Sequence, residues 1–408
     1  MNLVFLVLVL TAFVVAAITE LSGGRGAMEI LSSAIVDACA GAVPLALGLV
    51  GIMALFLGLM KVAEAGGLLG ATARLLRPVL ARLFPELPEG HPAMGAMVMN
   101  VAANLLGLGN AATPFGIRAM EELEHLNPRK GVASNAQVLF LAINTAGITL
   151  LPTKVIALRA SLGSTDPTAV VAPTLCATFA ATMVAIVTAR WLQRVWQPEP
   201  QSPALAKSAA GPLWPALIAL AVVAALVPVM LTAGRAIGPW VLPALVSGLL
   251  LYGAMRRVAI YECFIEGAKE GFAVAVRIIP YLVAILVAIA MVRASGAMDM
   301  ILAPISRLTA PLGLPAEALM MAALRTLSGS GSYGMLAASL KDPAIGPDSY
   351  LGLLLGTLYG STETTFYVLA VYFGAVRIRR IRHALAVGLI ADAAALITAV
   401  AICTMMMP

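Results

Sequence analysis

Long apolar runs separated by short polar stretches are the main pattern of this 408-residue chain. A helix needs about 20 residues to cross the hydrocarbon core of a bilayer, which is roughly 30 Å thick. The run at residues 1–19 has no charged segment before it and is long enough to span, so we expect an uncleaved first helix there rather than a secretory signal. The pattern predicts spanning helices at residues 1–19, 40–62, 134–158, 169–192, 213–233, 238–255, 273–295, 349–373 and 384–406.

Two further segments, at about 92–126 and 316–340, are apolar but are interrupted by small and polar residues. The interruptions read LGLGNAATPFG at 106–116 and LSGSGSYGM at 327–335. At membrane depth, broken helices are tolerated only where they are buried in protein or line a cavity. We therefore expect two helical hairpins, each of which enters and leaves the membrane on the same side.

The apolar run that follows each hairpin has a polar centre, which reads INTAGIT around Asn144 and GSTETT around Glu363. Paired interruptions at corresponding positions of two halves are typical of transporter binding sites. Residues 41–66 also align with residues 271–296 without a gap, and the same order of features follows each segment. The sequence therefore predicts an internal repeat.

The repeat divides the chain into a first half at 1–195, a linker rich in proline, glutamine and serine at 196–212, and a second half at 213–408. With the N-terminus in the cytoplasm and hairpins that do not cross, most lysine and arginine residues fall in the inner loops, as the positive-inside rule expects. Nine crossings then leave the C-terminus outside and give the two repeats opposite orientations. We expect an all-α, multi-pass protein of the bacterial inner membrane.

Composition agrees with a membrane protein, since 61% of the residues are hydrophobic, 11% are charged and the mean hydropathy is +0.97. We attribute the net charge of +6 to the inner loops, and we expect no nucleic-acid partner. No GxxxxGK[ST] loop occurs, so nucleotide hydrolysis is not expected. The four cysteines and three histidines are scattered. We therefore predict no metal site, and no cofactor beyond a coupling Na⁺ or H⁺.

Glu363 is the side chain most indicative of function, because a carboxylate inside a membrane usually marks a path for an ion, a proton or a substrate. The structural alternative is an acid satisfied by Arg325 or by the amides of a broken hairpin. Asn144 lies at a comparable depth in the first half, and its amide suits a neutral polar ligand. Mid-membrane amides also join helices, so for Asn144 both interpretations stay open.

Density of polar atoms at both hairpin interruptions favours a lined cavity over tight packing by small residues. We expect Glu363 and Asp392 to serve ion coupling, Lys154 and Arg277 to reach the membrane interface, and Arg325 to be buried. No nucleophile with a nearby base is evident, so we expect no catalytic residues and no enzyme. The candidate substrate-binding residues are Asn100, Asn104, Asn110, Thr113, Asn144, Thr145, Ser328, Ser330, Ser332, Glu363, Thr364 and Thr365.

These motifs resemble a fusion of spore maturation proteins A and B. MNVAANLLGLGNAATPFGIRAM at 99–120 and FLAINTAGITLLPTKVIALRASLGS at 140–164 are similar to the A protein. LSGSGSYG at 327–334 and the long segment at 346–385 are similar to the B protein. The resemblance implies a pair of nucleoside-recognition or gate domains, which are also found in concentrative nucleoside transporters. The fold expected is then two inverted gate-type repeats with about nine spanning helices and two re-entrant hairpins.

Two functions from different classes follow from these features. The first is an ion-coupled secondary transporter of a small polar solute, nucleoside-like by analogy, with its site at the midplane between the repeats. The alternative is a non-transporting membrane scaffold in envelope or spore maturation, which predicts that the polar centres are packed shut. The expected partners are lipid, a small-molecule solute and a second copy of the chain.

Overall fold

The computed structural model describes residues 2–23, 26–88, 90–107, 109–196 and 242–407, with single positions between 214 and 240. These residues form helices and turns, and the described part contains no strand. The predicted linker at 196–212, apart from Trp196, lies outside the described residues. The predicted span at 213–233 also lies outside them except at single positions.

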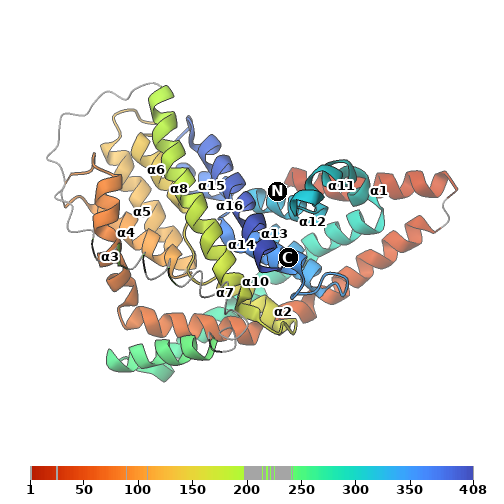
Figure 1. Cartoon of the computed structure of the whole chain (residues 1–408), viewed down its shortest axis with the longest axis horizontal. Coiled ribbons are helices and arrows are strands. Elements are labelled where there is room, and N and C mark those ends of the chain that lie inside the picture. The colour runs from red at the N-terminus through yellow and green to blue at the C-terminus, as the bar shows by residue number, and fades with distance from the viewer. Residues whose placement is uncertain are drawn as a thin grey trace.

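The first half contains a very long helix, a short helix, a helical hairpin, a broken helix and a final long helix (Figure 1). The hairpin consists of α4 and α5, and the broken helix consists of α6 and α7. The bounds are α1 Asn2–Leu21, α2 Ala27–Ala65, α3 Leu68–Leu83, α4 Pro92–Leu105, α5 Gly109–Leu126, α6 Asn135–Thr145, α7 Thr153–Ser161, η1 Pro167–Val170 and α8 Val171–Val195.

The second half repeats this order. Its hairpin consists of α12 and α13, and its broken helix consists of α14 and α15. The bounds are Leu242–Met255 for the helix that precedes the repeat, and α10 Ile260–Ala294, α11 Ala297–Thr309, η2 Ala310–Leu312, α12 Ala316–Leu327, α13 Gly329–Lys341, α14 Tyr350–Ser361, α15 Thr365–Ala375 and α16 Ala384–Met406.

A glycine in the left-handed conformation begins the short helix of each half. Gly67 (φ 86°) precedes α3, and Gly296 (φ 74°) precedes α11. Only glycine adopts this backbone conformation without a steric cost, so the sharp turn after each long helix is written into the sequence. In the first half the axis bends by 69° between residues 53–65 and 68–83.

The long helices α2 and α10 pack against each other in opposite directions. Lys61, near the end of α2, forms ion pairs with Glu266 and Glu270, near the beginning of α10. Leu31, near the beginning of α2, clusters with Met291, near the end of α10. The predicted spans at 40–62 and 273–295 are therefore parts of longer helices, and the equivalent helices of the two halves are antiparallel.

The prediction of continuous polar-centred spans at 134–158 and 349–373 is wrong, because each is two half-helices. Serine side chains cap the first half-helix of each pair, Ser134 in α6 and Ser349 in α14. Pro152, which has no N–H to donate, then stands directly before α7. In the second pair, tertiary hydrogen bonds to the backbone of Thr362 and Glu363 replace helical ones.

Each hairpin packs with half-helices from both halves of the chain. One hydrophobic cluster joins the hairpin α4–α5 to α6 and α15, and a second joins α13 of the other hairpin to α7 and α14. Helices α8 and α16 pack along each other. In Figure 1 the hairpin α4–α5 lies to the left of α8, and α12 and α13 lie to its right. The result is two lobes that are related by the repeat and interlocked by exchange of half-helices.

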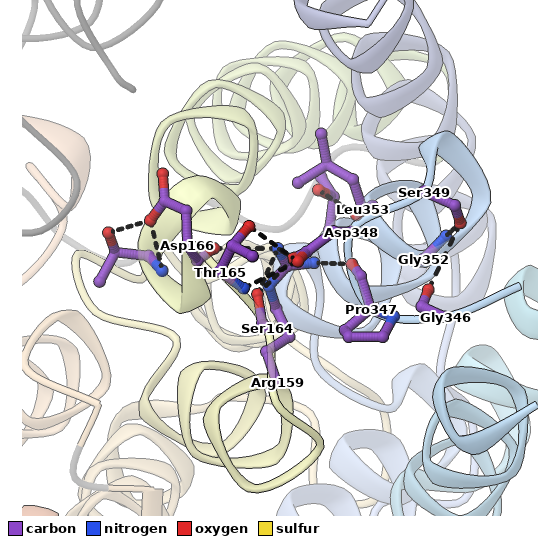
Figure 2. Close-up of polar contacts among 12 residues, drawn as sticks. Arg159, Ser164, Thr165, Asp166, Gly346, Pro347, Asp348, Ser349, Gly352 and Leu353 are labelled. Atoms are coloured by element: carbon purple, nitrogen blue, oxygen red, sulfur yellow. Dashed lines mark hydrogen bonds and ion pairs between the residues drawn. The ribbon is translucent and has the colours of Figure 1, made fainter. Parts of the chain in front are cut away.

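Loops at the two ends of the broken helices also join the halves. Val132, before α6, bridges Arg380, after α15. At the other end, Arg159 of α7 donates a 3.2 Å hydrogen bond to Asp348, which also accepts from Ser164 and Thr165 (Figure 2). The two connections are equivalent under the repeat, since each pairs the loop before one broken helix with the end of the other.

Three helices in the described part are individually long and apolar enough to cross a membrane. They are Ala27–Pro44 within α2, Pro167–Val195 and Ala384–Met406, and the bent pair α2–α3 would make a fourth. The broken spans at 134–158 and 349–373 do not qualify as single helices, and Phe5–Leu21 and Leu242–Met255 are shorter apolar helices. Since only the described residues are counted, this number does not test the nine crossings expected. The fold is that of an all-α, multi-pass membrane protein, and the number of crossings stays a prediction.

Candidate functional site

A cavity of about 520 Å³ lies where the two hairpin turns meet the two broken helices. Each of these four breaks contributes to its wall. The first half supplies Met53, Asn104, Gly107, Gly147, Thr149, Leu151, Pro152, Thr153, Lys154 and Val155, and the second half supplies Arg325, Leu327, Ser328, Gly329, Ser330, Tyr333, Tyr359, Gly360, Glu363, Thr364 and Tyr367.

Arg325, near the end of α12, is buried with only 7% of its surface exposed. Its guanidinium donates hydrogen bonds to the carbonyl of Thr362 and to the hydroxyl of Thr364, the latter at 3.2 Å. It also lies 4.7 Å from the centre of the Tyr359 ring and 3.7 Å from the Glu363 carboxylate. A buried charge is tolerated only when it is paired and hydrogen-bonded. This set of contacts therefore holds in place the break between α14 and α15, which we call the second break; the first break is the one between α6 and α7.

Glu363 combines a fixed backbone with an accessible side chain. Its N–H donates a 2.8 Å hydrogen bond to the carbonyl of Thr145, so the second break is tied to the first. Its side chain lines the cavity beside Arg325 and is 51% exposed. The carboxylate therefore retains acceptor capacity for a ligand.

An amide network supports the wall contributed by the first half. Asn104 donates to the side-chain oxygen of Asn144 (3.0 Å), which also accepts from the hydroxyl of Tyr372 (3.3 Å). Asn100 donates in turn to that hydroxyl (3.1 Å) and to the carbonyl of Ala112 (2.8 Å). Asn100 and Asn144 are almost fully buried, so they position Asn104 from behind rather than face the cavity.

Helix N-termini add partial positive charge to the cavity. The first residues of α7 and α13 line it, and so does Thr364, which precedes α15. The N–H groups at a helix start lack partners within the helix and favour acceptor groups of a ligand. At the start of α13 the hydroxyl of Ser328 accepts from the N–H of Gly331, so one of these groups is already satisfied.

Five of the predicted substrate-binding residues line this cavity: Asn104, Ser328, Ser330, Glu363 and Thr364. The structure describes no side chain for Asn110, although its backbone belongs to α5. The other predicted residues do not line its wall, and they are Asn100, Thr113, Asn144, Thr145, Ser332 and Thr365.

The predicted residues away from the wall support the fold around the breaks. The hydroxyls of Thr145 and Ser332 donate to carbonyls of their own helices, of Leu141 and Ser328 respectively. Thr365 donates a 2.7 Å hydrogen bond to Asp392, which lines a smaller cavity rather than this one. In the structure these residues stabilise the helices around the cavity. Their predicted roles in binding stay predictions.

Several lining residues were not among the candidates from the sequence. Tyr333 and Tyr359 pack with their ring centres 5.5 Å apart, and Tyr367 lies at the exposed edge. Lys154, expected at the membrane interface, is an exposed part of the wall. Aromatic residues in apolar runs carry no signal that separates core from cavity, so only the tertiary structure identifies them.

The described residues contain no group of three or more histidine, cysteine or acidic side chains that could hold a metal ion. The residues that line the cavity offer hydrogen-bonding groups, one carboxylate, two cationic groups and aromatic surface. These groups suit reversible binding of a small polar molecule.

Comparison with known proteins gives a family match and two similar proteins of known sequence. Residues 46–162 and 275–379 match the family described as "Gate: Nucleoside recognition". Spore maturation protein A of Bacillus subtilis (strain 168) is 42% identical over 167 residues, which is 41% of this chain and 85% of that protein. Spore maturation protein B of the same organism is 44% identical over 165 residues, which is 40% of this chain and 92% of that protein.

A similar solved structure is the crystal structure of the YdaH transporter of Alcanivorax borkumensis, described as having an unusual topology. It is 14% identical with a TM-score of 0.38, and the match covers 98% of this chain and 97% of that one.

Proposed function

This chain belongs to the nucleoside-recognition Gate family and unites sequences similar to spore maturation proteins A and B, and from that membership we propose that it is a secondary transporter of a small polar solute. The observation that carries the proposal is the cavity at which four chain breaks, two from each half, come together. Breaks are costly at membrane depth unless they line a cavity, so their convergence is best explained by a binding site.

The size and lining of the cavity support a small organic ligand. Its volume of about 520 Å³ lies within the range of ordinary ligand pockets, roughly 300–1,000 Å³. The wall mixes tyrosine rings with the amide of Asn104, the hydroxyls of Ser328 and Ser330, and the carboxylate of Glu363. A nucleoside suits this set, because its base can stack on a ring while its hydroxyls donate to a carboxylate.

Charge balance favours a solute without a large net charge. Arg325 and Glu363 lie 3.7 Å apart, so each largely compensates the other. Lys154 remains as an exposed cation at the wall. The alternative of a non-transporting scaffold predicts closed polar centres, whereas an open cavity with an exposed carboxylate favours binding.

The two lobes supply the parts that alternating access needs. Each lobe holds one hairpin together with half-helices from both halves of the chain, and the breaks lie between the lobes. Small rotations of one lobe against the other would open the cavity to one membrane face and close it to the other. We place the protein in the inner membrane of a bacterium, with the N-terminus in the cytoplasm and an ion gradient as the driving force.

The test is solute binding to the purified protein, measured as a shift of its unfolding temperature. The panel contains nucleosides, nucleobases and amino acids, and each is measured with wild type and with Glu363→Gln. A shift for one solute class in the wild type that the variant loses supports the proposal. Absence of any shift with a well-folded wild type would favour the scaffold.

A further inference from the structure

A second cavity, of about 240 Å³, lies among α12, α14 and α16. Arg325 is the residue that it shares with the larger cavity. Apart from Arg325, the polar residues on its wall are Asp392 of α16, Thr326 of α12, Ser361 of α14 and Thr362 of the second break. All four side chains present oxygen atoms.

The Asp392 carboxylate is only half satisfied. Its Oδ2 accepts a 2.7 Å hydrogen bond from Thr365, whereas its Oδ1 is buried and accepts none from the described residues. Thr326 and Thr362 lie close to the carboxylate, but neither completes a bond to Oδ1. A buried carboxylate oxygen without a partner is costly in free energy, so it calls for a ligand.

Two of the three neighbouring hydroxyls, those of Thr326 and Ser361, already donate their protons elsewhere. Thr326 already donates its proton to the carbonyl of Ala322 (3.0 Å), and Ser361 donates to that of Leu358 (3.1 Å). Each oxygen is left with lone pairs. Ser361 is also the last residue of α14, where the helix dipole adds partial negative charge. These oxygens and Asp392 Oδ1 offer lone pairs to a cation. The one guanidinium on the wall, Arg325, faces the two carboxylates of Asp392 and Glu363, so the charges there leave room for one added positive charge.

We propose that this second cavity binds the coupling cation, either Na⁺ or a proton, with Asp392 Oδ1 as its main ligand and the hydroxyl oxygens of Ser361 and Thr326 around it. Oxygen ligands of this kind suit a hard cation. The assignment of a coupling role rests on the proposed transport function, but cation binding itself does not.

Arg325 connects the two cavities. It is the charged group that acts on Asp392 from α12, and it lies 3.7 Å from Glu363 on the side of the larger cavity. A cation at Asp392 would neutralise one of the two carboxylates that this guanidinium balances, and so change its interaction with Glu363. Solute and cation affinity are then coupled, and the coupling is reciprocal.

The experiment measures thermal unfolding of the purified full-length protein in sodium, potassium or choline chloride at equal ionic strength, and at a series of pH values. The variants are Asp392→Asn and Ser361→Ala. Asp342→Asn controls for loss of an unrelated acid, because Asp342 pairs with Arg293 and lines neither cavity.

A rise in the unfolding temperature with sodium, lost in Asp392→Asn and kept in Asp342→Asn, supports a sodium site. Stabilisation by acid that only Asp392→Asn loses supports a proton site. If Asp392→Asn does not fold, weaker sodium dependence in Ser361→Ala supports the site and unchanged dependence on both sodium and pH rejects it.

The proposal is overturned if sodium and pH affect Asp392→Asn as they affect the wild type. Solute shifts measured in the same samples separate this inference from the proposed function. A solute shift without any cation effect rejects only the cation site, whereas a cation effect without a solute shift rejects only the transport proposal.

Discussion

The backbone N–H of Glu363 donates a 2.8 Å hydrogen bond to the carbonyl of Thr145. Thr145 ends α6 at the break of the first half, and Glu363 lies in the break of the second half between α14 and α15. More than half of the chain separates them in sequence. The N–H of Glu363 and the carbonyl of Thr145 each lack a partner within a helix, and here they pair with each other. This bond stabilises both breaks, because unpaired backbone groups are costly at membrane depth.

Replacement of Glu363 by glutamine tests the role of its carboxylate. Glutamine keeps the size of the side chain and leaves the backbone bond to Thr145 intact, so folding is expected to persist. Loss of a charge-assisted hydrogen bond to the solute should weaken binding by about tenfold or more. Isothermal titration with the solute found in the binding panel measures the change, and unchanged affinity would show that the carboxylate does not contact the solute.

Replacement of Arg325 by alanine is expected to destabilise the protein by about 3–5 kcal/mol, since it leaves the carbonyl of Thr362 and the carboxylate of Glu363 without their partner. Arg307 is an exposed residue of α11 and offers a matched control. Chemical unfolding in detergent should show a large effect for Arg325→Ala and a small one for Arg307→Ala. Equal effects would contradict the role given to Arg325.

A pair of glycines in α2 tests the close contact between the long helices. A methyl group at Gly58 would lie 2.7 Å from the Phe264 ring and 2.9 Å from its carbonyl oxygen, whereas one at Gly51 would meet nothing within 4 Å. Gly58→Ala should therefore lower stability by about 1–3 kcal/mol through overpacking. Gly51→Ala should be neutral or raise stability by about 0.5–1 kcal/mol, because alanine favours a helix. The unfolding free energies of the two variants test this contact, and equal values would contradict close packing at Gly58.

The contact between Arg159 and Asp348 predicts a dependence of stability on pH. Burial opposes ionisation of Asp348, but hydrogen bonds from Ser164 and Thr165 and the charge of Arg159 outweigh it and hold the pKa of Asp348 below its usual value. The carboxylate therefore contributes stability above its unfolded-state pKa, and this contribution is lost as the pH falls through the lowered value. Acidification should destabilise the wild type more than Asp348→Asn.

Parallel slopes of unfolding temperature against pH for the wild type and Asp348→Asn would contradict this account. The carboxylate is partly exposed, so the effect is expected to be modest and to weaken in high salt.

The predicted orientation can be tested with single cysteines in a background without the native ones. Lys130 and Ala344 are exposed residues in loops at the two opposite ends of the broken helices. With the N-terminus in the cytoplasm, a membrane-impermeant thiol reagent applied outside intact cells should label Ala344→Cys and spare Lys130→Cys. The reverse labelling would invert the topology.

The sequence predicted the two hairpins well, because glycine, serine and asparagine inside apolar runs disfavour a continuous helix. It also predicted the repeat, since features such as the glycine that precedes α3 and its counterpart before α11 occur in the same order. The breaks inside 134–158 and 349–373 were missed. A run with a polar centre is compatible with a continuous helix, and only tertiary partners for Thr145, Thr362 and Glu363 make the break favourable.

Part of the site could not be predicted from the sequence for the same reason. Asn104 and Asn144 have the same polarity, but one lines the cavity and the other holds it from behind. Which side an amide faces depends on how half-helices from distant parts of the chain pack. The exchange of half-helices between the lobes has no local signature in the sequence.

The most direct test of transport is counterflow into proteoliposomes that contain the purified protein and are loaded with unlabelled nucleoside. The account predicts transient accumulation of labelled nucleoside that requires the protein and is lost in Glu363→Gln, while Asp342→Asn retains it. Wild-type protein that is folded and correctly inserted, but accumulates neither nucleosides nor any other small polar solute of the binding panel, would contradict the proposal that the cavity belongs to a transporter.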